Sequence, residues 1–170
     1  MARTVIITGG NIGEMKPRLR HAQQLINQNI GIVLRCSHVY ESEPWGFTAE
    51  NRFMNQAMVV DTELSPAELL DAVQEIERQL GRDREAEAAQ KTNSGERYSS
   101  RVIDVDIIFY DDLVMESETL TIPHPLMHER EFVLAPLSEI APAMIHPVFG
   151  KSVEQLRHEL SERLKSVENA

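Results

Sequence analysis

The sequence predicts an α+β fold of the ferredoxin-like βαββαβ type, in which helices pack on one face of an antiparallel sheet, plus a C-terminal extension. Segments with strand patterns and segments with helical spacing follow one another in the order strand, helix, strand, strand, helix, strand. The chain has 170 residues, of which 42% are hydrophobic and 26% charged, as expected of a globular domain. We therefore expect a single domain over residues 1–170.

The first strand and the first helix are predicted at residues 3–8 and 15–27. The strand carries a β-branched run at residues 5–7 and stops at two glycines. The helix has Pro17 in its first turn, where the missing N–H costs no hydrogen bond. Its apolar residues recur at helical spacing and are Leu19, Ala22, Leu25 and Ile26.

Two strands, at residues 30–40 and 53–61, precede the second helix. The first of them alternates in polarity, and one of its faces consists of Ile32, Leu34, Cys36 and His38. The helix begins at a capping box formed by Ser65 and Glu68, and it ends at Gly81. Its apolar face consists of Leu69, Val73, Ile76 and Leu80.

The rest of the chain is predicted as a long loop, a strand and a C-terminal helix. Residues 81–100 are polar without an apolar period, so we expect a loop. Residues 102–110 form the next strand, with a short partner at residues 113–115. Residues 121–147 contain five prolines and should form only short helical turns. A second capping box, at residues 152–155, opens a helix with Val153, Leu156, Leu160 and Leu164 on one face.

Charge and cysteine content limit the classes of partner. Seventeen basic residues against 27 acidic ones give a net charge of −10, which disfavours nucleic acid and anionic membranes as partners. A small phosphorylated ligand remains compatible with this charge. No apolar run approaches the roughly 20 residues that span a bilayer, and none resembles a signal peptide. One cysteine, Cys36, excludes an internal disulfide, so we expect a cytoplasmic location.

Two aspartates on one strand are the strongest indication of chemistry. Asp104 and Asp106 lie on the same side of the strand at residues 102–110, about 6–7 Å apart at their Cβ atoms. The opposite side should face the helices and consists of Ile103, Val105, Ile107 and Phe109. Because like charges on one strand face repel, we expect a cation such as Mg²⁺ beside them. A solvated sheet face that carries two acids is the alternative.

Arginines flank the aspartate strand in the sequence. Arg82 and Arg84 follow the second helix, Arg97 lies in the long loop, and Arg101 directly precedes the strand. Carboxylates for a metal beside guanidinium groups for phosphate oxygens indicate phosphoryl transfer. The same segment also holds four acidic residues, so a solvated, self-paired loop is the alternative. The glycines at residues 9–13 lack the lysine and the spacing of a P-loop.

The loop between the two middle strands is apolar where loops are usually polar, with Pro-Trp-Gly-Phe at residues 44–47. Phe53 and Asn55 follow on one side of the next strand. A ring and a side-chain amide can stack on and hydrogen-bond a flat heterocycle, although a hydrophobic cap on the sheet edge would have the same composition. His124 and His128 are separated by a proline that disrupts a helical zinc site, so phosphate contact or a structural use is favoured.

Several segments together resemble the 6-hydroxymethyl-7,8-dihydropterin pyrophosphokinases of folate biosynthesis. The most specific of them is RYSSRVIDVDII at residues 97–108. The others, in the family's order, are residues 9–13, 42–55, 76–84 and 123–135, so the match covers nearly the whole chain. The resemblance implies the ferredoxin-like fold and transfer of pyrophosphate from ATP to the pterin hydroxymethyl group, with release of AMP.

The resemblance also implies roles for individual residues. The catalytic residues would be Arg84, Arg101, Asp104 and Asp106, and the two aspartates would hold two Mg²⁺ ions. The ATP-binding residues would be Gln74, Glu77, Arg84, Arg101, Ile107, Thr121, His124 and Arg130. The pterin-binding residues would be Gly9, Ser42, Glu43, Trp45, Phe53, Asn55, Asp104 and Phe132, with the two phenylalanines sandwiching the ring. We expect ATP and a pterin alcohol as substrates of a monomer.

Two features leave alternatives open. Residues 85–100 form a longer stretch than in short family members, so the sequence does not identify which of them reach substrate. Glu43 replaces a common proline and Phe53 a frequent tyrosine of the family. The competing functions are a metal-dependent phosphohydrolase that uses the same aspartates, and a non-catalytic ferredoxin-like module that binds RNA or a regulatory ligand.

Overall fold

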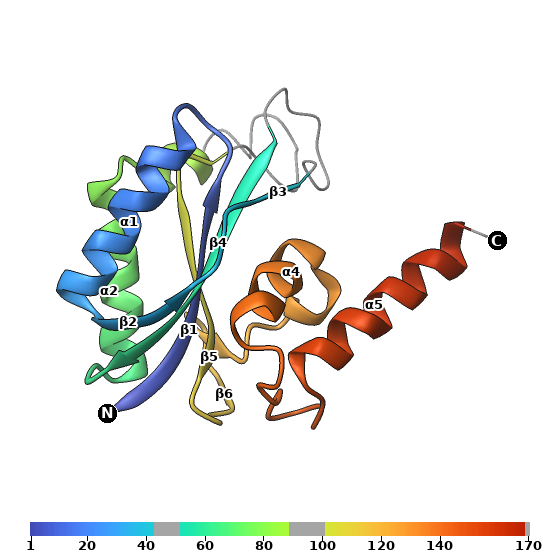
Figure 1. The fold of residues 1–170 in the computed structure, drawn as a ribbon. Helices are drawn as coiled ribbons and strands as arrows, with labels where there is room; N and C mark the ends of the chain where they lie inside the picture. The colour runs from blue at the N-terminus through green and yellow to red at the C-terminus, as the bar shows by residue number, and fades with distance from the viewer. Residues whose placement is uncertain (43–51, 89–100, 169–170) are drawn as a thin grey trace.

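An antiparallel sheet forms the centre of the computed structural model, which describes residues 1–42, 52–88 and 101–168 (Figure 1). Its strand order is β2-β4-β1-β5, and β3 also pairs with β4. This is the order that two interleaved βαβ units produce, so the predicted α+β fold is confirmed. The strands are β1 (Ala2–Gly10), β2 (Gly31–Cys36), β3 (Tyr40–Ser42), β4 (Phe53–Thr62) and β5 (Asp104–Tyr110).

Helices α1 (Met15–Asn29) and α2 (Pro66–Gln79) cover one face of the sheet. The predicted capping box is present, because the Ser65 side chain accepts from the Glu68 N–H and the Glu68 carboxylate accepts from the Ser65 N–H. The core on this face joins both helices to the sheet, and its largest fully buried members include Ile6, Leu19, Ile26, Met58, Leu69 and Ile76.

The other face of the sheet is covered as well, which corrects the expectation of helices on one face only. Helices α4 (Glu131–Ile140) and α5 (Val153–Glu168) pack there, and α5 then runs outward to the C-terminus (Figure 1). The prediction of only short turns over residues 121–147 was therefore wrong for α4. This helix contains Pro136, but six of its ten residues are buried, and that burial outweighs the lost backbone hydrogen bond.

A β-bulge in β5 changes the predicted alternation of that strand. Ile6 pairs with Ile107 and Val5 pairs with Phe109, so Ile108 is an additional residue. Val105 and Ile107 face α1 and α2 as predicted, whereas Phe109 belongs to the core beneath α4 and α5. The predicted orientation of Phe109 was therefore wrong, and that of the two residues before the bulge was right.

Two further segments differ from the sequence prediction. The strand expected at residues 30–40 is interrupted into β2 and β3, and an irregularity lies between Val33 and Arg35. Part of the expected long loop, residues 84–88, is helical. The remaining short elements are β6 (Met115–Glu116), β7 (Thr121–Ile122) and a 3₁₀ helix (Met127–Glu129). No helix in the described part of the chain is long and apolar enough to cross a membrane.

Candidate active site

The two aspartates lie on β5, an edge strand, beside the glycine end of β1. Asp106 pairs in register with Ile7, and Asp104 pairs with Gly9. Gly9 also pairs with Asn55 on its other side, so Asp104, Gly9 and Asn55 cross three neighbouring strands on one face. A Cβ atom at Gly9 would lie 2.2 Å from Asn55 Oδ1, so only glycine keeps this strip of the sheet free of side-chain atoms.

The two aspartates differ in their electrostatic surroundings. Burial opposes the charge on Asp104, but Arg82 and Arg101 outweigh it and the pKa of Asp104 is lowered. Burial raises the pKa of Asp106 well above its ordinary value, and the neighbouring Asp104 and Glu77 raise it further. Two arginines therefore favour the ionised form of Asp104, whereas Arg130 alone favours that of Asp106, and an additional positive charge there would stabilise the ionised form of Asp106.

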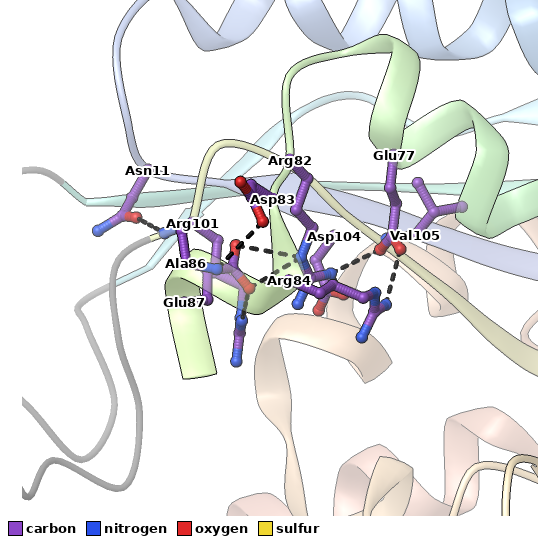
Figure 2. Close-up of polar contacts among 10 residues, drawn as sticks. All are labelled: Asn11, Glu77, Arg82, Asp83, Arg84, Ala86, Glu87, Arg101, Asp104 and Val105. Carbon is purple, nitrogen blue, oxygen red and sulfur yellow. Dashed lines mark hydrogen bonds and ion pairs between the residues drawn. The ribbon is translucent and has the colours of Figure 1, made fainter. Parts of the chain in front are cut away.

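Arg82 connects α2 to the aspartate strand. Its guanidinium is 4% exposed, and its Nη1 lies 2.6 Å from Glu77 Oε2 and 2.9 Å from Asp104 Oδ1 (Figure 2). Burial opposes the charge on Arg82, but Asp104, Glu77 and Glu87 together raise its pKa. Arg82 therefore remains a fixed cation that positions Asp104.

Glu77 supports this arrangement from the last turns of α2. Its carboxylate is 1% exposed and also accepts from Arg84 Nη2 at 2.7 Å and from the Val105 N–H at 2.9 Å. The Val105 N–H points outward from the edge strand, so Glu77 satisfies a backbone donor that no neighbouring strand meets. Sequence analysis placed Glu77 near ATP, and the structure shows its carboxylate engaged with two arginines and the strand.

Arg101 is held from two directions before the strand begins. Its N–H donates to Asn11 Oδ1 at 2.8 Å, and its carbonyl accepts from the Asn11 N–H at 2.9 Å. Its Nη1 lies 2.9 Å from Glu87 Oε2 (Figure 2). Arg101 is therefore anchored to the glycine loop after β1, and its side chain already binds a carboxylate oxygen.

Polar atoms without partners mark the neighbouring strands β3 and β4. Asn55 is 5% exposed, and its Nδ2 finds no hydrogen-bond partner in the described part of the chain. Ser42 Oγ is buried and also has no hydrogen-bond partner among the described residues. Ser42 lies opposite Phe53 in the register of β3 and β4. Buried donors and acceptors without partners are rare, and they fit a ligand with a polar edge.

A cavity of about 420 Å³ lies between β3 and the ends of α4 and α5. Its lining includes Ser42, Tyr40, Arg130 and Phe132. The Arg130 guanidinium carbon lies 5.5 Å from the centre of the Phe132 ring, a cation–π contact that orients both side chains. The structure thus brings Ser42, Arg130 and Phe132, which the sequence predicted for two different substrates, to one cavity.

A second cavity, of about 330 Å³, includes Thr121 and His124 in its lining. Burial, followed by the charge of Arg130, lowers the pKa of His124 to about 4. The ring is therefore neutral near pH 7, and its Nδ1 accepts from the Leu126 N–H at 3.3 Å. A neutral His124 can donate a hydrogen bond to a phosphate oxygen from Nε2.

The remaining predicted residues are distributed as follows. Ile107 is buried in the core beneath α1 and α2, and Gln74 is half-buried on α2. Glu43 and Trp45 lie outside the described residues. Sequence analysis did not include Arg82 among the site residues and did not single out Glu87, because a polar stretch does not reveal which distant partner each charge meets.

The carboxylate pair fits a magnesium site. Mg²⁺ is usually held by one or two carboxylates together with substrate phosphates and water. Asp104 and Asp106 supply these oxygens on one strand face, where burial and then the charges of Asp104 and Glu77 raise the pKa of Asp106. Among residues 1–42, 52–88 and 101–168, no three His, Cys, Asp or Glu side chains cluster as a metal site. Further ligands would have to come from the substrate and water.

Comparisons with known proteins identify the family of this chain. A family model described as 7,8-dihydro-6-hydroxymethylpterin-pyrophosphokinase matches residues 5–142. The 2-amino-4-hydroxy-6-hydroxymethyldihydropteridine pyrophosphokinase of Bacillus subtilis is 40% identical over 136 residues, which cover 79% of this chain and 75% of that protein. The protein of the same name from Porphyromonas gingivalis is 38% identical over 148 residues, covering 86% of this chain and 95% of its own.

Solved structures support the fold. The crystal structure of wild-type Plasmodium falciparum HPPK-DHPS with pteroate superposes with a TM-score of 0.76 at 14% identity. The match covers 99% of this chain and 46% of that one, so this chain spans less than half of that protein. Together with the family model and the curated relatives, this shows that the chain belongs to the 7,8-dihydro-6-hydroxymethylpterin-pyrophosphokinase family.

Proposed function

We propose that this chain performs pyrophosphoryl transfer to 6-hydroxymethyl-7,8-dihydropterin with Asp104 and Asp106 as the ligands of two Mg²⁺ ions. The reaction itself follows from family membership: the chain is a pyrophosphokinase of folate synthesis, and ATP is its co-substrate. The observation that carries the metal assignment is the pair Asp104 and Asp106 on one face of β5, where the charge of Asp104 adds to the electrostatic cost of charging Asp106 and arginines lie nearby for phosphate.

The pterin would lie on the strip formed by Gly9 and Asn55. The orphaned Asn55 Nδ2 and Ser42 Oγ supply hydrogen-bonding groups for its polar edge, and the absence of a side chain at Gly9 gives the flat ring access to the sheet. Phe53 and Phe132, on β4 and α4, would stack on its two faces. Asp104 pairs with Gly9, so the hydroxymethyl group of a pterin on this strip can approach the carboxylates.

The ATP phosphates would lie between the aspartates and the surrounding basic residues. Arg101, Arg84, Arg130 and His124 would bind the phosphate oxygens, and the aspartates would share the metal ions with them. Mg²⁺ at this place would neutralise phosphate charge and lower the pKa of the pterin hydroxyl. The hydroxyl oxygen then attacks the β-phosphorus of ATP and AMP leaves, so no covalent enzyme intermediate is needed.

Gln74 and Thr121 would contact the nucleotide, and Ile107, whose side chain is buried in the core beneath α1 and α2, would do so only through its backbone. Glu77 would act through the arginines that it holds. Glu43 and Trp45 are proposed pterin contacts on the resemblance alone. The lone cysteine supports a cytoplasmic location, and the net charge of −10 supports the absence of a nucleic-acid or membrane partner. The monomeric state is proposed without a structural observation.

Phosphorus NMR of the purified protein with ATP, Mg²⁺ and the hydroxymethyl dihydropterin tests this proposal. We expect AMP and a pterin diphosphate to form together, and only when all three components are present. Phosphate release from ATP without the pterin would instead identify a phosphohydrolase. Turnover that continues in excess chelator would overturn the metal assignment.

A further inference from the structure

Glu87 places an internal carboxylate between two arginines of the active site. Its Oε2 lies 3.1 Å from Arg82 Nε and 2.9 Å from Arg101 Nη1 (Figure 2). Its Oε1 lies 3.2 Å from the same Arg82 nitrogen. One carboxylate oxygen therefore receives hydrogen bonds from two guanidinium groups, the arrangement that arginines offer to a phosphate oxygen.

The segment that carries Glu87 lies on the surface. Residues 84–88 are helical, and the Ala86 N–H donates to Asp83 Oδ1 at 3.0 Å while the Glu87 N–H donates to the Asp83 carbonyl at 3.1 Å. The residues on both sides of Glu87 are exposed, and Glu87 belongs to neither apolar core cluster. The Glu87 carboxylate can therefore leave the two arginines without disrupting the core.

The two arginines depend on Glu87 to different degrees. Arg82 keeps Glu77 and Asp104 as partners of its Nη1 when Glu87 leaves. Arg101 keeps only its backbone bonds to Asn11, because its Nη1 is bonded to Glu87 itself. Departure of Glu87 would therefore make the Nε of Arg82 and the Nη1 of Arg101 available to another anion beside Asp104.

We propose that Glu87 is a built-in competitor of ATP, which occupies the position of a phosphate oxygen between Arg82 and Arg101 and is displaced when the nucleotide binds. ATP must then replace an existing ion-pair network rather than enter an open site. The ion pairs with Glu87 keep both guanidinium groups oriented in the free protein. Because ATP must break these ion pairs, its affinity is lowered. This inference rests on the proposed binding of ATP phosphates by Arg101.

Calorimetric titration with the Mg²⁺ complex of α,β-methylene ATP, a non-transferable analogue, tests the proposal. Glu87→Gln removes the charge and keeps the shape, so the analogue should bind about 3- to 10-fold more tightly. The matched control is Glu85→Gln, which removes the same charge from an exposed position of the same segment. The control should change the affinity less than about 2-fold if Glu87 acts by contact rather than through net charge.

The following outcomes would contradict the role of Glu87 or the proposed phosphate site. Unchanged or weaker binding by Glu87→Gln would overturn the competitor role, as would equal tightening by Glu85→Gln. Arg101→Ala, measured in parallel, should weaken binding of the analogue. If Arg101→Ala binds normally, the proposed phosphate site is wrong, and the role of Glu87 as a competitor falls with it. If Arg101→Ala binds weakly and Glu87→Gln is unchanged, only the inference about Glu87 is wrong.

Discussion

The two faces of the central sheet come from the same strands but have different compositions. Towards α1 and α2, the strands present a mainly apolar surface that includes Ile6 and Met58, and the two buried threonines on this face of β1, Thr4 and Thr8, donate their hydroxyls to backbone carbonyls. Towards α4 and α5, the surface begins in the same way, with Ile7 and Ala57, but continues past the helices as the strip of Gly9, Asn55 and Asp104. The face towards α1 and α2 packs in the core over its whole length. On the face towards α4 and α5, polar groups replace part of the apolar packing.

The acids on the two sides show what this difference means physically. Glu77, at the end of α2, is buried with two arginines and a backbone N–H as partners. Burial is the main cause that raises the pKa of both acids, and Asp104 raises both further. They differ in their partners: Glu77 is held by protein donors, whereas half-buried Asp106 lies beside a second aspartate with only the charge of Arg130 in its favour, so we interpret Asp106 as available to a ligand cation.

The sharpest test of this contrast is Asp106→Asn. We expect kcat to fall by about 10³-fold, because a metal ligand is lost, while the thermal unfolding temperature stays the same or rises, because an unfavourable charge is removed. Steady-state kinetics and calorimetry on the same preparation measure both. Asp112→Asn, an exposed acid in the turn after β5, is the control and should leave both unchanged. Near-normal turnover by Asp106→Asn would contradict the assignment.

Glu77→Gln, in contrast to Asp106→Asn, should lower the stability of the fold. Removing one member of a buried ion-pair network leaves Arg82 and Arg84 incompletely neutralised, so the free energy of unfolding should fall by about 3 kcal/mol. Urea denaturation followed by circular dichroism measures this loss. Glu75→Gln, on the exposed side of the same helix, should cause no measurable loss. Equal stability of the two variants would show that the network around Glu77 contributes nothing to the fold.

Asn55→Ala should separate binding from stability on the polar strip. Asn55 Nδ2 has no hydrogen-bond partner among residues 1–42, 52–88 and 101–168, so its removal should not destabilise the fold, while affinity for the pterin should fall by about 10- to 100-fold. Titration with the pterin, and separately with the ATP analogue, distinguishes the two substrates. Gln56→Ala, whose side chain donates to the Ser37 carbonyl instead, should leave pterin affinity unaltered. An unchanged pterin affinity in Asn55→Ala would remove this residue from the pocket.

The pH dependence of stability provides the smallest expected effect. The lowered pKa of His124, about 4 in the folded protein against an ordinary value near 6.5, means that the folded state favours the neutral ring. This contribution is present above the unfolded pKa and is lost as the pH falls from about 6.5 towards 4. Between pH 7 and pH 5, wild type should therefore lose about 1–2 kcal/mol more stability than His124→Asn. Parallel loss in both proteins would show that His124 titrates normally.

Sequence patterns predicted the elements whose contacts are local. The spacing of Leu69 and Val73 and the Ser65 capping box identified α2, and the alternation around Asp104 placed both aspartates on one side of β5. Helix α4 was missed because its proline argued against a helix locally, whereas burial against the sheet decides the outcome. The bulge at Ile108 has no local signal, since it depends on the register with β1.

The candidate site was also predictable only in part, because several of its contacts depend on the tertiary fold rather than on local sequence. The aspartates and Asn55 were found because their residue types are unusual for strand positions. Arg82 meets Asp104 across 22 residues of sequence, and Glu87 meets Arg101 across 14, so their pairing depends on the tertiary fold. A segment rich in both charges is equally compatible with many pairings, and composition cannot choose among them.

The close approach at Gly9 also restricts how this enzyme can become resistant to an inhibitor that mimics the pterin. Many enzymes escape such compounds by enlarging one residue in the pocket, but a methyl group at Gly9 would lie 2.2 Å from Asn55 Oδ1 and 2.9 Å from the Met54 carbonyl oxygen. A larger residue there would displace the amide that we propose as a pterin contact. An inhibitor that rests on this strip should therefore select escape substitutions elsewhere, in side chains such as Phe132, which lines the neighbouring cavity.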